Sequence, residues 1–189
     1  QVAIPMFILA GNLMDAGGAL DRIVKFAQAT VGRFKGGMAH VNILASMMFA
    51  GVTGSAVADV AALGPLEIEM MTSQGYEKDY ATSVTVASAC IGPIIPPSLP
   101  LIMFGVVSGT SVGALLMAGA IPGIVMGLAL MLQVVYVAHK YNLPTSEAYP
   151  FKEMIKTFLP AISAMSIVII VLGGIYSGFF TPTEAAGVA

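Results

Sequence analysis

A cluster of small, hydroxyl and carboxylate residues interrupts an apolar stretch of this chain at residues 49–59. The sequence there is F-A-G-V-T-G-S-A-V-A-D, in which Thr53, Gly54 and Ser55 stand together and Asp59 follows about one helical turn later. In a membrane-embedded chain, backbone that leaves a helix is tolerated only against protein or a water-filled cavity. Oxygen atoms at such a point can coordinate an alkali cation, and a helix amino end can hold a carboxylate. The cluster therefore predicts a binding site for something small.

A second cluster, rich in proline, interrupts the apolar stretch 81–107. Residues 90–100 read C-I-G-P-I-I-P-P-S-L-P. Proline removes an amide donor and clashes with the preceding helical turn, so one helix should end near Ile91 and a new one should start near Pro97 or Ser98. Carbonyl oxygens at the first end suit Na⁺, and N–H groups at the second start suit a substrate carboxylate. One break alone is typical of a proline kink, but two neighbouring breaks favour a transport site.

The composition predicts a membrane protein. The 189 residues are 57% hydrophobic and 10% charged, with a mean hydropathy of +0.90. Residues 80–138 form a run of 59 without Asp, Glu, Lys or Arg, and residues 157–183 form another of 27, against roughly 20 needed for one spanning helix. A net charge of −2 argues against a nucleic-acid partner. The single cysteine, Cys90, excludes an internal disulfide, and no histidine or acid lies near it at metal-ligand spacing, so no transition-metal site is expected.

These clusters must be positioned by helices, and we expect an all-α, polytopic membrane domain. Apolar residues at helical spacing, with charges on the other face, predict an amphipathic helix along the membrane surface after the first span. The sequence starts within an apolar segment and stops just after a helix start, so we expect a piece of a longer protein. The expected elements are a span over 1–17, the surface helix over 20–35, a re-entrant hairpin over 40–73, a broken span over 81–107, and spans over 112–138 and 158–180.

The positions of the basic residues predict how the interrupted segment sits in the membrane. If residues 41–71 cross once, the eight basic residues fall four and four on opposite sides. If the segment returns to the face it entered and the next two segments each cross once, all eight lie on one side, as the positive-inside rule expects. Two complete crossings also satisfy the rule, but residues 40–53 supply only about 21 Å of helix against a hydrocarbon core of roughly 30 Å. We therefore predict a helical hairpin whose tip, at residues 53–55, stops near mid-membrane. The basic residues are Arg22, Lys25, Arg33, Lys35, Lys78, Lys140, Lys152 and Lys156.

Four stretches of the chain resemble, in the same order, the large membrane subunit of TRAP transporters, the tripartite ATP-independent periplasmic carriers of organic acids. The resemblance covers essentially the whole chain, and such long co-linear matches are far more specific than a lone motif. The stretches are I-P-M-F-I-L-A-G-N-L-M at 4–14, G-G-M-A-H-V-N-I-L-A-S-M-M-F-A-G-V-T-G-S-A-V-A-D at 36–59, I-G-P-I-I-P-P-S at 91–98 and G-G-I-Y-S-G-F-F-T-P-T-E-A-A at 173–186.

The resemblance implies a secondary transporter of a bacterial or archaeal inner membrane, coupled to Na⁺ and built from two inverted repeats with an elevator-like moving part. This chain would hold most of the first repeat. Implied partners are a small membrane subunit, a soluble periplasmic binding protein, membrane lipid and an organic acid such as a C4-dicarboxylate, a sialic acid or a keto acid, with no cofactor besides the coupling ion. The implied site residues are Thr53, Gly54, Ser55, Gly92, Pro93 and Pro96 for Na⁺, and Ser55, Pro97 and Ser98 for the substrate.

Four acidic residues need separate interpretation. Asp59 lies in the first turn of the return helix, so we expect it to support the helix dipole or a hydrogen bond, with direct ion or proton binding as the alternative. Glu184 fits a capping box that starts at Thr181, and we interpret it as structural. Glu67 and Glu69 stand where the family has a more apolar run, and they should lie near the cytoplasmic surface.

Two other classes of function remain as alternatives. Ser55 follows a glycine at membrane depth and, with His40 or His139, would suggest an intramembrane serine hydrolase. However, His40 is expected about 20 Å from the tip, and His139 is expected at the membrane boundary. A passive anion channel would use similar helix ends, but paired breaks fit alternating access better. We also expect the Ser55 hydroxyl to cap the return helix, which is compatible with lining a site.

Overall fold

The computed structural model describes residues 17–145, 151–180 and 184, and these residues form helices joined by turns, with no β-sheet among them. The all-α class predicted from the sequence is thus confirmed for the described part. The first expected span, at residues 1–17, lies almost entirely outside it. The helices are α2 (Ala19–Val31), α3 (Gly37–Thr53), α4 (Ala56–Ala62), α5 (Gly64–Ser73), α6 (Lys78–Ala89), α7 (Leu99–Ser108), α8 (Val112–Tyr141) and α9 (Phe151–Tyr176).

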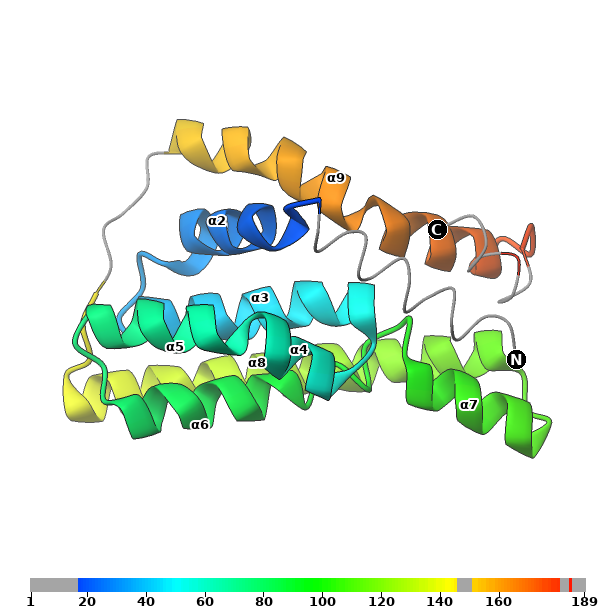
Figure 1. Cartoon of the computed structure of the whole chain (residues 1–189), viewed down its shortest axis with the longest axis horizontal. Helices are drawn as coiled ribbons and strands as arrows, with labels where there is room; N and C mark the ends of the chain where they lie inside the picture. Colours follow the sequence, from blue (N-terminus) through cyan, green and yellow to red (C-terminus); the bar gives the residue numbers. More distant parts are fainter. Residues whose placement is uncertain (1–16, 146–150, 181–183, 185–189) are drawn as a thin grey trace.

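Helix α3 is the centre of the packing. It contacts α2 and α9 on one side and α6 and α8 on the other, with α4 and α5 alongside (Figure 1). Nearly every residue of α3 is buried, because apolar side chains surround this helix on all sides. Helix α2 is amphipathic and buries Ile23, Val24 and Ala27 against its neighbours, while Asp21 and Lys25 remain exposed.

Helices α3, α4 and α5 form a hairpin that runs out and back. Both ends of this hairpin lie against the segment after α8: the Gly36 amide donates to the Pro144 carbonyl at 3.1 Å, and the Tyr76 hydroxyl donates to the same carbonyl at 3.2 Å. Lys35 also contacts this segment, through a 2.6 Å hydrogen bond from Nζ to Asn142 Oδ1. The start and the end of the hairpin therefore lie at the same end of the molecule.

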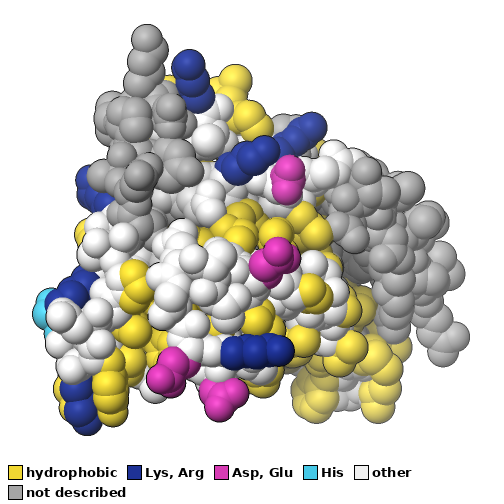
Figure 2. All heavy atoms as spheres, turned by 60° about the vertical axis from the view of Figure 1, so that its left-hand side comes forward, with side chains coloured by type: hydrophobic (Ala, Val, Ile, Leu, Met, Phe, Trp, Pro, Cys, Tyr) yellow, Lys and Arg dark blue, Asp and Glu magenta, His cyan; other side chains and the backbone are white. Residues whose placement is uncertain are grey.

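Charged side chains are spread over that end. In Figure 1 it is the left-hand side, where α2, α5 and α8 finish and α3, α6 and α9 begin. Figure 2 brings this side forward and shows Lys, Arg, Asp and Glu side chains across it. The opposite end of the hairpin, at residues 53–55, points toward the interior of the structure and meets the segment between α6 and α7 (Figure 1).

Helix α8 has the character of a membrane span. Among the described residues it is the one helix that is both long enough and apolar enough to cross a membrane, and only 17% of its most apolar window is buried. A soluble core helix would be mostly buried, whereas this one exposes Ile121, Val125, Leu128 and Leu132. The finding agrees with the membrane class expected from composition.

Candidate functional site

The turn between α3 and α4 is made by three residues with distinct roles. Helix α3 ends at Thr53 because Gly54 adopts the left-handed conformation, with φ 58°, and its amide donates to the Ala50 carbonyl at 2.9 Å. Ser55 is extended, and its hydroxyl accepts from the Ala58 amide at 3.4 Å, so it caps α4 as predicted. Thr53 and Ser55 are both only half-buried. This turn, residues 53–55, is called the tip.

The segment between α6 and α7 is not helical, and it is called the break, residues 90–98. Helix α6 ends at Ala89 and α7 begins at Leu99. Ser98 joins the two sides of the break, because its buried hydroxyl donates to the Pro93 carbonyl and accepts from the Leu101 amide at 3.3 Å. The peptide bond between Pro96 and Pro97 is cis.

The tip and the break are in direct contact. The Leu99 amide donates to the Gly54 carbonyl at 3.4 Å. A Cβ atom added at Gly54 would lie 2.2 Å from the Pro97 carbonyl oxygen, and one added at Gly92 would lie 3.2 Å from the backbone of Ser55 and of Ala56. Gly54 is therefore needed for this approach, because a side chain there would push the two backbones apart, whereas one at Gly92 would make a tight contact. Residues about forty positions apart in the sequence form one compact backbone junction.

The predicted site residues in this junction differ in how far they are exposed to solvent. Thr53 and Ser55 present half-buried hydroxyl groups, and Pro93 is half-buried as well. Ser98 is fully buried with its hydroxyl already hydrogen-bonded, so its placement favours holding the break together. Gly54, Gly92, Pro96 and Pro97 are buried and contribute backbone rather than side-chain chemistry. Hydroxyl and carbonyl oxygens are hard ligands that suit a cation such as Na⁺, and the glycines keep the space beside them free of side chains.

A buried polar network, not predicted from the sequence, ties the hairpin to α6. Asn42 on α3 donates to Thr85 Oγ1 at 2.7 Å, and its carbonyl oxygen accepts from the Ser88 hydroxyl at 2.8 Å. Ser46, one turn further along α3, donates to Ser88 at 3.1 Å. All four side chains are buried. The only signal in the sequence was a pair of polar residues at helical spacing on each of two helices, four positions apart on α3 and three apart on α6.

Two carboxyl groups are buried on the return arm of the hairpin, which consists of α4 and α5. Asp59 lies in the first turn of α4, where a carboxylate complements the helix dipole. It faces Ser46, and its Oδ1 has no hydrogen-bond partner in the part of the chain that the structure describes. Both Glu67 and Glu69 are expected from the sequence to lie near the cytoplasmic surface. In the structure Glu69 is exposed, but Glu67 is 4% exposed and neither of its carboxyl oxygens has a hydrogen-bond partner among the described residues.

The remaining titratable positions lie away from the junction. His139 is exposed near the end of α8, with Nδ1 2.8 Å from the Val135 carbonyl oxygen of its own helix. His40 is buried in the first turn of α3, at the opposite end of that helix from the tip. Glu184 is exposed, and Thr181, its expected capping partner, lies outside the described residues. Within residues 17–145, 151–180 and 184, no three His, Cys, Asp or Glu side chains are grouped to hold a metal ion.

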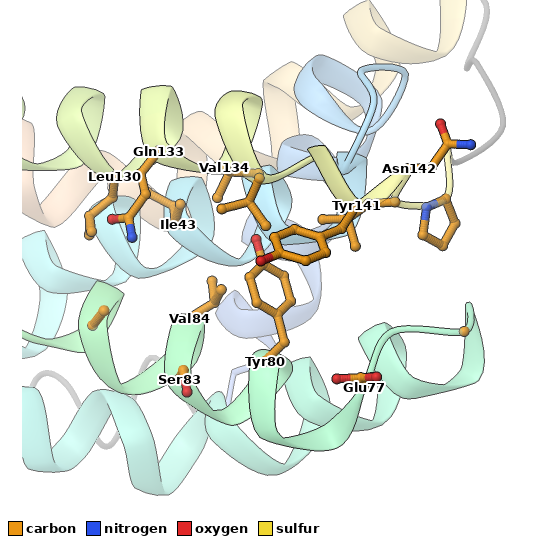
Figure 3. A pocket seen from close by; sticks show the side chains of 15 residues that line it. Ile43, Glu77, Tyr80, Ser83, Val84, Leu130, Gln133, Val134, Tyr141 and Asn142 are labelled. Carbon is orange, nitrogen blue, oxygen red and sulfur yellow. The ribbon is translucent and has the colours of Figure 1, made fainter. Parts of the chain in front are cut away.

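A cavity of about 720 Å³ lies at the base of the hairpin rather than at the tip (Figure 3). It opens between α3, α6 and α8, and its lining includes Tyr80, Gln133 and Tyr141. Tyr76 stands in the sequence between two lining residues, Gly75 and Glu77, and burial raises the pKa of its hydroxyl to about 12, so this group remains a neutral donor to Pro144. The cavity therefore has no part in the junction of tip and break.

Comparison with known proteins matches the whole chain to one family. The family model for the DctM component of the tripartite ATP-independent periplasmic transporter covers residues 1–189. The chain is 45% identical over 188 residues to the large permease protein SiaM of a sialic acid TRAP transporter from Vibrio cholerae. It is also 45% identical to the large permease protein YiaN of a 2,3-diketo-L-gulonate TRAP transporter from Escherichia coli, and 42% identical to the large permease protein DctM of a C4-dicarboxylate TRAP transporter from Vibrio cholerae. All of this chain aligns in each case, but it spans only 44%, 44% and 42% of these relatives.

Proposed function

The chain belongs to the DctM family of tripartite ATP-independent periplasmic transporters, and from this membership we propose that it forms part of the large permease subunit of a Na⁺-coupled importer of organic acids. The family consists of transporter permeases, so the serine hydrolase alternative is not favoured. Named relatives serve sialic acid, 2,3-diketo-L-gulonate and C4-dicarboxylates, all of which carry a carboxylate. We propose a substrate of this class, a small organic anion.

The contact between the tip and the break is the observation that carries the proposal. Two helices end at this junction, α3 at Thr53 and α6 at Ala89, and two begin, α4 after Ser55 and α7 after Ser98. Carboxyl ends supply carbonyl oxygens for a cation, whereas amino ends supply N–H groups and a positive dipole end for a carboxylate. One junction thus offers both kinds of binding group side by side.

We assign the coupling ion to Thr53, Gly54 and Ser55 of the tip with Gly92, Pro93 and Pro96 of the break. The organic acid is assigned to Ser55 with Pro97 and Ser98, where the backbone and capping hydroxyl of the α7 start are found. Asp59 acts in support of the tip in this scheme, since it faces α3 from the first turn of α4. Na⁺ and the acid are both transported species, and the chain's own groups only bind and orient them.

The membrane placement is also part of the proposal. We place the hairpin as re-entrant, entering and leaving through the cytoplasmic side of the inner membrane. The support is that residues 36 and 76, at its two ends, both bond to Pro144, and that the charged end of the molecule is this same end. The full protein would act with a small membrane subunit and a periplasmic binding protein that delivers the acid.

Uptake by the complete reconstituted complex tests the proposal. Proteoliposomes that contain the full-length large subunit, the small subunit and the binding protein should take up the acid only when Na⁺ is present outside. Uptake that is indifferent to replacing Na⁺ with K⁺ would refute the coupling. Ser55→Phe should abolish uptake without preventing assembly, whereas Ser83→Phe, at an exposed position of α6, should not. Normal uptake by the Ser55 variant would refute the site assignment.

A further inference from the structure

Glu67 is a buried acid that neither the tip nor the break uses. It lies on α5 with 4% of its surface exposed, and it lines a small space of about 10 Å³ between α2, α3 and α5. That volume corresponds to about one water molecule. Both carboxyl oxygens lack a hydrogen-bond partner among the described residues. The other residues that line the space are Val24, Met38, Val41, Asn42, Ala45 and Met70.

No positive charge compensates Glu67 in the described structure. The basic residues of α2 are on its exposed face, and one of them, Lys25, is 3.5 Å from Asp21. On α4, Asp59 is close enough to repel a second negative charge. An uncompensated buried carboxylate costs several kcal/mol, so the group must acquire a proton or a cation. The titratable or charged side chains of the helices that pack on α5 or line the space are Asp21, Arg22 and Lys25 on α2, His40 on α3, Asp59 on α4, Glu69 on α5 itself, and Lys78, Asp79 and Tyr80 on α6.

The lining of the space decides between a proton and a cation. A bound Na⁺ needs several oxygen ligands, as hard cations do. Besides Glu67, the lining has one side chain with an oxygen atom, Asn42, and that oxygen already accepts from the Ser88 hydroxyl. Five apolar side chains make up the rest. The space can therefore stabilise a neutral carboxylic acid, with room for one water, but it cannot replace the hydration shell of an alkali ion.

We propose that Glu67 is a proton-binding site, and that this proton holds the return arm of the hairpin against α3. When Glu67 is neutral, α5 packs on α3 beside the apolar side chains of Val24, Val41 and Ala45 at no electrostatic cost. When it is ionised, the carboxylate must reach water, which requires α5 to separate from α3. The packing of the hairpin is thus linked to pH, with the packed state lost as pH rises. This site is separate from the proposed Na⁺ and substrate site.

Infrared difference spectroscopy of the complete, purified complex tests proton occupancy directly. The spectrum of the wild type minus that of Glu67→Gln at neutral pH should show the carbonyl stretch of a neutral carboxylic acid. Glu69→Gln, two residues away and exposed, is the matched control and should remove only ionised carboxylate bands. Glu67→Leu provides a second variant that also fills the site without charge. If the difference spectra of the Glu67 variants instead show the bands of an ionised carboxylate, the proposal is wrong. It is also wrong if the carbonyl band of the wild type shifts when Na⁺ is added.

Hydrogen–deuterium exchange tests the structural consequence. After correction for the intrinsic pH dependence of exchange, residues 64–73 of the wild type should lose protection as pH is raised above neutrality. Glu67→Gln should keep its protection, and Glu69→Gln should behave like the wild type. Equal pH dependence in wild type and Glu67→Gln would overturn the proposal. Neither measurement requires Na⁺ or a transported acid, so failure here is distinguishable from failure of the transport function.

Discussion

Replacing Gly54 by alanine separates the tip from the break more directly than any other single change. The added Cβ would lie 2.2 Å from the Pro97 carbonyl oxygen and 3.0 Å from the Leu99 amide nitrogen. Both are backbone atoms, so no side chain can rotate away to make room. Gly54 also has a φ of 58°, in the left-handed region that alanine adopts only with strain.

The steric clash and the backbone strain together set the size of the effect on uptake. Left-handed backbone costs a residue with a Cβ about 1–2 kcal/mol. Ordinary contact for a Cβ begins at 3.4 Å, so tip and break must move apart by about 1 Å. That displacement also breaks the 3.4 Å hydrogen bond from the Leu99 amide to the Gly54 carbonyl. In positioned sites a misplacement of about 1 Å can cost about 100-fold in rate, and we expect uptake to fall by about that factor.

Gly109→Ala is the control that isolates the clash. Gly109 ends α7 as Gly54 ends α3, with a φ of 70°, but an added Cβ would meet no atom of the described residues within 4 Å. Both variants should lose about 1–2 kcal/mol of stability from backbone strain. Only Gly54→Ala should lose uptake in proteoliposomes that contain the complete complex. Thermal unfolding of the same preparations measures the shared strain.

One result would refute this reasoning. If Gly54→Ala and Gly109→Ala transport equally well at matched protein levels, the contact between tip and break does not position the site. The junction would then be a packing contact, and the binding groups would have to lie elsewhere.

Two further predictions concern the same region. Gly92→Ala should reduce uptake by less than Gly54→Ala, because its added Cβ meets the backbone of Ala56 only at 3.2 Å. Gly173→Ala, whose added Cβ meets no described atom within 4 Å, should leave uptake unchanged in the same assay. Thr85→Val keeps the side-chain shape but removes the 2.7 Å hydrogen bond from Asn42. It should lower the free energy of unfolding by about 1–3 kcal/mol, measured by thermal or denaturant unfolding. An unchanged free energy would mean that water replaces the hydroxyl.

The alternation of apolar runs with turn residues predicts an all-helical chain, and the described residues are helical. Gly54 between two hydroxyl residues predicts an interrupted helix, and Ser55 caps the following helix as predicted. The prolines predict a second interruption because they cannot continue a helix, and α6 ends at Ala89 while α7 begins at Leu99. Such local signals act within a few residues, so they locate where helices stop without showing what those ends touch.

The return arm shows where local signals were insufficient. It was predicted as one element, but α4 ends at Ala62 and α5 restarts at Gly64, with Pro65 in its first turn. Glu67 and Glu69 are two residues apart on that second helix and look equivalent in the sequence. A helix turns about 100° per residue, so they point to different sides, and only the position of α2 and α3 decides that Glu67 is the buried one.

The sequence by itself determined the membrane class, the family and the two points at which helices are interrupted, because hydropathy, glycine and proline act locally. The tertiary structure decided that these two points meet, since the contact of Gly54 with Pro97 and of Gly92 with Ser55 depends on how the hairpin packs beside α6. It also decided which polar groups are buried. Asn42 gains its partners, and Glu67 lacks one among the residues that the structure describes, because burial is a property of neighbouring helices rather than of the helix that carries the residue.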